Sequence, residues 1–219
     1  LRLGLYPLHL WQPVELAGEL DRAILVYLVP AAAGLALWVR LTAIQGLPEG
    51  NLWSVIALVT ALVGGVQAWL QSEPHESLPH LALGYGGMLI LQNTAASVQT
   101  SAVALVAGSA SWLLGLTLLF MGQSFTRRTW LWAALSAIGA AALAGLPLTV
   151  GFVGRLTFYQ GAITGPVWMV LTAIVAETLL ISAMFRRLLV PEAVLRVPEG
   201  ILAHIGYSIA LAVAASPLL

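Results

Sequence analysis

Two charged side chains lie deep within apolar stretches of this sequence. Arg155 follows the run GFVG at residues 151–154, and Glu177 lies near the middle of the apolar run at residues 167–185. Because a charge at the centre of a bilayer costs about 2.5–3.5 kcal/mol on insertion scales, such residues face the interior of a helix bundle and pair. This placement favours an Arg155–Glu177 ion pair. In the alternative arrangement, Arg155 reaches an interface from a helix end and Glu177 is protonated.

Histidines form the second titratable group. His75 and His80 flank Glu76 in the run EPHESLPH at residues 73–80. The unperturbed imidazole pKa of about 6.5 suits the relay of protons near neutral pH. The cluster predicts a short relay at the entrance of an ion pathway, and the alternative is a solvated loop. A metal site is not expected, because two prolines interrupt the cluster and no i, i+4 pair of ligands on one helix is guaranteed.

All nine positively charged residues of the chain are arginine, and there is no lysine. A buried lysine shifts its pKa readily and can release and regain a proton, whereas arginine stays protonated. The sequence can therefore fix positive charge, but it offers few groups that pass a proton on.

The composition is that of a membrane protein. Apolar residues make up 60% of the chain and charged residues 8%, against roughly 25% in soluble domains. The zero net charge, with no basic run longer than a pair, excludes a nucleic-acid partner. The lack of cysteine excludes disulfides and thiolate nucleophiles. No dinucleotide fingerprint, P-loop or Ser-His-Asp arrangement is present, so we expect no catalytic residues and no cofactor.

Apolar runs long enough to approach the ~20 residues of a spanning helix follow one another along the chain. They cover residues 23–39, 52–70, 80–96, 101–121, 129–146, 148–164, 167–185 and 201–216. The run at 148–164 is interrupted, so the pattern predicts six or seven full spans and one irregular piece. The loops are short, which leaves no room for a soluble domain. We therefore expect residues 1–219 to form one all-α transmembrane bundle of about 6–8 segments.

A first motif lies at the start of the sequence. The run YPLHLWQP at residues 6–13 contains Pro7, His9, Trp11 and Pro13. These residues resemble the P-x-H-x-W-x-P signature of the antiporter-like subunits of respiratory complex I and of Mrp-type cation/proton antiporters. In that family the signature lies in mid-chain, which implies that this sequence is the C-terminal part of a longer subunit. The alternative is an ordinary helix entrance with interfacial aromatic residues.

A second motif strengthens the resemblance. The run GLPLTVGFVGR at residues 145–155 closely resembles the family's G-[IL]-P-x-T-x-G-F-x-G-K segment, whose lysine is thought to lie on the proton path. Arg155 replaces that lysine. Between the two motifs, residues 64–91 resemble the family's helix, short loop and helix with an Ala-His-x-Gly-Tyr-like turn, which here contains Tyr85. The matching residues of the second motif are Gly145, Pro147, Thr149, Gly151 and Gly154.

The second motif also has a physical reading. Proline lacks an N–H group and clashes with the preceding turn, and closely spaced glycines loosen a helix. Within a membrane such a backbone is tolerated only where it is packed in protein or lines a watered cavity, and broken helices present partial charges to permeating ions. We therefore expect an interrupted helix near residues 146–154. The alternative is a simple proline kink between packed helices.

The chain departs from the family at key positions. Ala31 stands where the family's helix S-K-x-x-G-x-x-x-x-x-R has its first key lysine, while Gly34 and Arg40 match the glycine and arginine of that helix. His75 or a neighbour corresponds to the basic residue of the junction before Tyr85. A complete lysine relay therefore cannot operate in this part of the chain.

The resemblance implies an ion-translocating membrane subunit of a complex I-like NADH:quinone oxidoreductase or Mrp-type assembly, which moves protons or sodium ions. Its partners would be other membrane subunits and the lipid bilayer, and the resemblance implies a multi-pass location in the inner membrane of a prokaryotic cell. The expected pathway residues are Arg155, Glu177, His80, His75 and Tyr85. The alternative is a degenerate paralogue that serves as a structural or partner-binding subunit without transport of its own. In either case, NADH or quinone chemistry would belong to partner subunits.

Overall fold

The computed structural model describes residues 29, 31–34, 36–38, 52–71, 76–95, 98–124, 130–163 and 165–189. Within these ranges every regular element is a helix, which agrees with the expected all-α fold. Residues 29, 31–34 and 36–38, which precede α2, are helical. The labelled helices are α2 (Leu52–Leu70), α3 (Ser77–Ala95), α4 (Val98–Ser124), α5 (Trp130–Ala144), α6 (Val150–Ala162) and α7 (Val167–Leu189).

Two of the helices are long and apolar enough to cross a membrane by length and composition. These are Leu52–Leu70 and the segment Val167–Arg186 of α7. Large apolar side chains on both helices face outward, among them Val55, Val66 and Leu171. An apolar outer surface on helices of spanning length is what a bilayer solvates.

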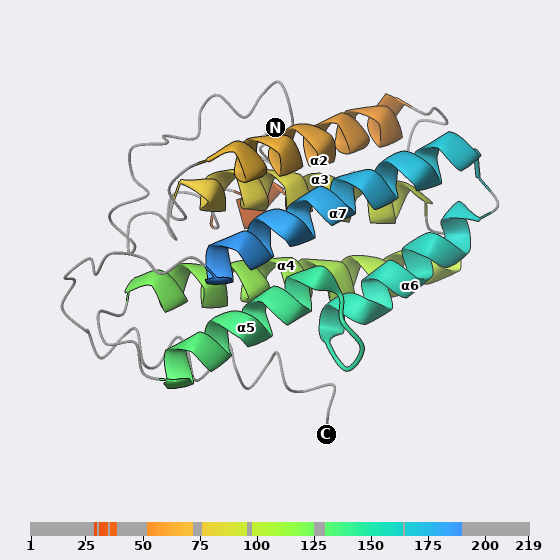
Figure 1. Ribbon diagram of the computed structural model, residues 1–219. Coiled ribbons are helices and arrows are strands. Elements are labelled where there is room, and N and C mark those ends of the chain that lie inside the picture. The colour runs from red at the N-terminus through yellow and green to blue at the C-terminus, as the bar shows by residue number, and fades with distance from the viewer. Residues whose placement is uncertain are drawn as a thin grey trace.

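The helices lie side by side in one bundle (Figure 1). α2 and α3 are antiparallel: Ser54 Oγ donates a hydrogen bond to Thr94 Oγ1 (3.1 Å) at one end, and the side chains of Gln71 and His80 meet at 3.2 Å at the other. α7 runs parallel to α2, since Arg186 near the end of α7 donates to the carbonyl of Trp69 near the end of α2 (2.5 Å).

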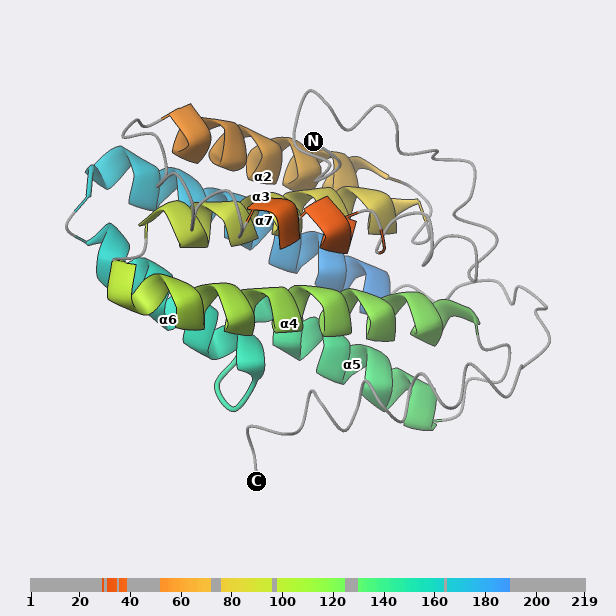
Figure 2. The same ribbon diagram turned by 180° about the vertical axis from the view of Figure 1, so that it is seen from behind.

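α5 and α6 together form one discontinuous rod along α4. Gly139 of α5 packs against Leu118, and Gly154 of α6 packs against Gly108, so the contacts advance in one direction along α4. Seen from behind in Figure 2, α4 extends over both shorter helices. By helical rise, the 27 residues of α4 span ~40 Å, whereas α5 and α6 span only ~22 and ~20 Å. Neither short helix reaches across a hydrocarbon core of about 30 Å by itself.

This arrangement corrects one expectation from the sequence. Residues 129–146 and 148–164 were expected to be a full span and a separate irregular piece. They are instead two halves of one crossing of the bundle, interrupted between α5 and α6. The apolar pattern continues through both halves, so hydropathy alone does not reveal that they are stacked end to end.

The core consists of apolar side chains from all the labelled helices, such as Leu81, Leu116, Phe158 and Leu180. Only a few polar residues are buried among the described residues. Two of them are charged, Arg155 and Glu177, each with 8% of its surface exposed. The buried uncharged polar residues are Thr60, Ser77, Gln92 and Ser111.

Candidate functional site at the helix break

The break between α5 and α6 begins with a Schellman turn. Gly145 has a φ of +63°, a left-handed conformation that glycine adopts without steric cost. Its N–H bonds to the carbonyl of Ala142 (3.2 Å), and the N–H of Leu146 bonds to that of Ala141 (3.0 Å). These are the two hydrogen bonds that define this type of helix end. Pro147 then prevents the helix from continuing.

The remainder of the break is short and strained. Leu148 has a φ of +73°, which is uncommon for a residue with a side chain and costs about 1–2 kcal/mol. Thr149 is the N-cap of α6 in an extended conformation, and its Oγ1 donates back to the carbonyl of Leu146 (2.7 Å). The irregular segment therefore covers residues 145–149, and the helix resumes at Val150.

Gly151 and Gly154, the last two glycines of the second motif, lie in the helix that follows the break. Their lack of a side chain serves packing. A Cβ on Gly151 would collide with the carbonyl oxygen of Ala142 and lie 2.7 Å from Ser111 Oγ. A Cβ on Gly154 would lie 3.3 Å from the backbone nitrogen of Gly108. These glycines bring α6 close to α4 and to the end of α5.

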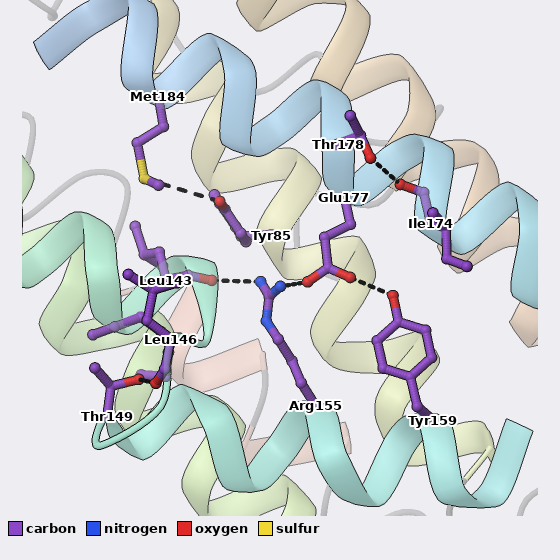
Figure 3. A network of polar contacts seen from close by, with 12 residues as sticks. Tyr85, Leu143, Leu146, Thr149, Arg155, Tyr159, Ile174, Glu177, Thr178 and Met184 are labelled. Atoms are coloured by element: carbon purple, nitrogen blue, oxygen red, sulfur yellow. Dashed lines mark hydrogen bonds and ion pairs between the residues drawn. The ribbon is translucent and has the colours of Figure 1, made fainter.

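Arg155 projects from α6 back toward the break and joins three helices (Figure 3). Its Nη2 donates to the carbonyl oxygen of Leu143 in the last turn of α5 (2.5 Å). Its Nη1 forms an ion pair with Oε1 of Glu177 on α7. A cation at a helix C-terminus is stabilised by the negative end of the helix dipole, so the guanidinium has one anionic partner and one partner with a partial negative charge. The structure thus brings together Arg155 and Glu177.

Both carboxylate oxygens of Glu177 have partners. Oε1 contacts Arg155, and Oε2 accepts a hydrogen bond from the phenol of Tyr159, one turn further along α6 (Figure 3). A carboxylate at this depth is costly to bury unless it is paired and hydrogen-bonded, and Glu177 has both kinds of partner. The site is therefore a neutral pair of opposite charges rather than an isolated charge.

Tyr85 lies beside the pair on α3. The Arg155 guanidinium carbon lies 5.9 Å from the centre of the Tyr85 ring, within the range of a cation–π contact. The Tyr85 hydroxyl points instead toward Met184 of α7, with the oxygen 3.9 Å from the sulfur. Tyr85 therefore adds a ring face to the site rather than a strong hydrogen bond.

Removal of the hydroxyl group is expected to lower the free energy of unfolding by different amounts at the two tyrosines. Tyr159→Phe removes a hydrogen bond to a charged group and should lower the free energy of unfolding by about 1.5–3 kcal/mol. Tyr85→Phe keeps the ring face beside Arg155 and removes a hydroxyl that donates to a weak sulfur acceptor, so it should have a smaller effect. Thermal denaturation of the two variants in bilayers measures the difference. Equal losses would mean that the Tyr159–Glu177 bond contributes nothing specific.

A small pocket also borders Arg155. Its volume is about 20 Å³, and it lies where α3, α4, α5 and α6 meet. Gln92 and Ser111 are its uncharged polar side chains, and Ser111 Oγ donates to the carbonyl of Ala142 (2.6 Å). The polar interior thus continues from the ion pair toward α3 and α4.

The histidine cluster lies apart from the ion pair as far as it is described. His80 is in the first turn of α3, five residues or ~7.5 Å along the helix axis before Tyr85, and its ring contacts Gln71. His75 lies outside the described residues, as does the first motif with Pro7, His9, Trp11 and Pro13. In the described part of the chain, no three of the His, Asp and Glu side chains are grouped to hold a metal ion.

Sequence reasoning missed three polar residues of the site. Tyr159 is four residues after Arg155 and so shares its helix face, a spacing that points to a common partner. Gln92 is seven residues after Tyr85, which also places the two on one face of α3. Ser111 carries no comparable signal, because only the packing of α4 against α5 brings it to the break.

Comparison with known proteins gives relatives of a single kind. No family model matches the sequence. It is 30% identical over 198 residues to NADH-quinone oxidoreductase subunit N of Rubrobacter xylanophilus, and 27% identical over 199 residues to subunit N of Chromohalobacter salexigens. Each alignment covers 80% of this chain and 41% of the relative. NADH-ubiquinone oxidoreductase chain 2 of Oncorhynchus mykiss is 28% identical over 192 residues, which cover 84% of this chain and 50% of that protein.

A solved structure has the same fold. It is a chain in the structure of the membrane-bound sulfane sulfur reductase, an archaeal respiratory membrane complex, which matches with a TM-score of 0.77 at 19% identity. The match covers 99% of this chain and 51% of that chain. The chain thus spans about two-fifths to one-half of the length of the proteins it matches. Over most of its own length, it is a distant homologue of the antiporter-like membrane subunits called subunit N or chain 2 in NADH:quinone oxidoreductases.

Proposed function

We propose that this chain is an ion-translocating membrane subunit of a complex I-like NADH:quinone oxidoreductase or Mrp-type antiporter assembly, and that it moves protons or sodium ions. The observation that carries the proposal is the buried Arg155–Glu177 ion pair at the end of α5. Charges at such depth are costly, and in membrane proteins they mark ion pathways. In transporters, ion sites also lie at broken helices, because the ends of the half-helices present partial charges to the ion.

The chain would act as part of a larger assembly. Its relatives are named as subunits of NADH-quinone oxidoreductases, and the solved structure with the same fold belongs to a respiratory membrane complex. We therefore propose other membrane subunits and the lipid bilayer as its partners. We also propose a multi-pass location in the inner membrane of a prokaryotic cell. Electron transfer would take place in the partner subunits.

A second function is favoured by one specific observation. Ala31, at the position where the family has its first key lysine, is buried with 3% of its surface exposed and has no ionisable group. The only buried charges among the described residues also neutralise each other. A subunit with these features would serve as a structural or partner-binding element that moves no ions.

Ion flux separates the two functions. In vesicles containing the full assembly, we expect Arg155→Ala, Glu177→Gln and His80→Ala to reduce proton flux, because each removes a titratable or fixed charge from the proposed path. Arg155→Lys keeps the charge, and lysine releases a proton more readily, so flux should be kept or increased. Flux per incorporated assembly that is unaltered by all three removals would assign the chain to the structural role.

The orientation in the membrane is a further expectation. The end of α4, the start of α5 and the end of α7 lie at the same end of the bundle, on the left in Figure 1. The α4–α5 connection carries Arg127 and Arg128, and the last turn of α7 carries Arg186 and Arg187. At the opposite end, the sequences that join α3 to α4 and α6 to α7, residues 96–97 and 163–166, contain no arginine or lysine. By the positive-inside rule, the arginine-rich end faces the cytoplasm.

Single cysteines test this orientation cleanly, because the sequence contains none. Ser124→Cys places a thiol at the arginine-rich end, and Gly165→Cys places one at the other end. A membrane-impermeant maleimide added outside cells should label only the variant at Gly165. It should label the variant at Ser124 only in inverted vesicles. The reverse pattern would overturn the expected orientation.

A further inference from the structure

The pocket beside Arg155 has the size and lining of a site for one water molecule. A buried water needs a cavity of about 10–15 Å³ and two to four polar partners. This pocket has a volume of about 20 Å³. It is bordered by Arg155, Gln92, Ser111 and Tyr85, of which each is more than nine-tenths buried.

The donor for such a water is the guanidinium group of Arg155. A guanidinium carries five N–H groups, and buried N–H groups in native proteins find acceptors. The contacts with Glu177 and with the carbonyl of Leu143 use one N–H from each of two nitrogens. Arg155 therefore retains donor capacity where it borders the pocket.

The acceptor is the side-chain carbonyl of Gln92. Gln92 Oε1 lies 2.9 Å from the place where a Cβ on Gly108 would be, and 3.2 Å from that on Gly154. Glycines on α4 and α6 thus leave the space that the amide oxygen occupies. Gln92 and Arg155 both line the pocket, so the amide and the guanidinium border the same space. An amide with 6% of its surface exposed is costly to bury unless something else bonds it.

We propose that the pocket binds one water molecule, which accepts a hydrogen bond from Arg155 and donates one to Gln92, and that Gln92 is the residue that holds it. A cation is disfavoured beside the guanidinium, and an anion is disfavoured by the carboxylate of Glu177, so a neutral ligand fits. The bound water extends the polar chain from Tyr159, through Glu177 and Arg155, across the bundle to α3. This site does not rest on the proposed ion translocation.

Water-edited solid-state NMR of the ¹⁵N-arginine-labelled protein in bilayers tests the site. The Arg155→Lys variant identifies the Arg155 signal among those of the nine arginines. In the wild type, we expect magnetisation to pass from water to the Arg155 guanidinium. Gln92→Met keeps a similar volume but removes the acceptor, so transfer should be lost. Gln67→Met is the matched control, because Gln67 is a largely buried glutamine on α2 that does not border the pocket.

This experiment can fail independently of the flux experiment, because magnetisation transfer reports only whether water contacts the Arg155 guanidinium and does not report ion movement. A wild-type protein without transfer to Arg155 would overturn the water site. Transfer that persists in Gln92→Met would overturn the role of Gln92. Where Gln92→Met does not fold, an electron cryo-microscopy map of the wild-type assembly decides, at a resolution that shows other buried waters. Density between Arg155 and Gln92 supports the site, and its absence refutes it.

Discussion

Glu177→Gln is expected to lower the free energy of unfolding by about 3–5 kcal/mol, because it leaves the Arg155 guanidinium buried without its counter-charge. The carboxylate accepts from both Arg155 and Tyr159, and a neutral amide cannot replace the ionic contact. Thermal or denaturant unfolding of the protein in bilayers or detergent measures the loss. Reduced incorporation into the assembly should accompany it.

Glu76→Gln is the matched control for this substitution. Glu76 lies in the turn before α3 and is partly exposed, so loss of its charge should change stability by no more than about 0.5 kcal/mol. A double replacement, Arg155→Met with Glu177→Leu, removes both charges and should be less destabilising than either single removal. Equal effects of Glu177→Gln and Glu76→Gln would show that the pair does not stabilise the fold.

Gly151→Ala is the second substitution that is expected to lower the free energy of unfolding strongly. A single Cβ at this position meets the carbonyl oxygen of Ala142 and Ser111 Oγ, which already form a hydrogen bond with each other. Backbone atoms cannot rotate away, so α6 must move from α5 and α4. Overpacking of this kind costs about 1–3 kcal/mol, and loss of the Ser111 bond adds to it.

Gly86→Ala provides the comparison. Gly86 is also a buried helical glycine, but a Cβ there would make ordinary contacts with Trp112 at 3.8–4.0 Å. Alanine is the better helix former by about 1 kcal/mol, so this variant should be neutral or stabilised. Unfolding midpoints of the two variants, measured under the same conditions, give the contrast. If Gly151→Ala were as stable as Gly86→Ala, the close approach of α6 to α5 would be wrong.

Local sequence signals predicted the individual helices well. The apolar run at residues 52–70 coincides with α2, and the run that begins at residue 167 coincides with the start of α7. The break was also predicted near its true place, since Gly145 and Pro147 disrupt a helix whatever surrounds them. Arg155 and Glu177 could be paired from sequence because two opposite charges in apolar runs each need a partner.

The packing of the helices against one another could not be predicted from local sequence signals. Nothing in residues 129–164 indicates that α5 and α6 stack end to end along α4, because their apolar character is the same as that of independent helices. Gln92 and Ser111 become part of the site only through the packing of α3 and α4 around Arg155. The roles of His75 and His80 in an ion pathway remain predictions from sequence.

Arg155 also has a mechanical consequence for the bundle. It belongs to α6, yet it is bonded to the last turn of α5 and to the middle of α7, so one side chain couples three helices. The turn at residues 145–149 is the hinge between α5 and α6, and α7 is bonded to Arg155 beside it. A displacement of α7 along its axis must therefore either stretch the ion pair or swing α6 about that hinge.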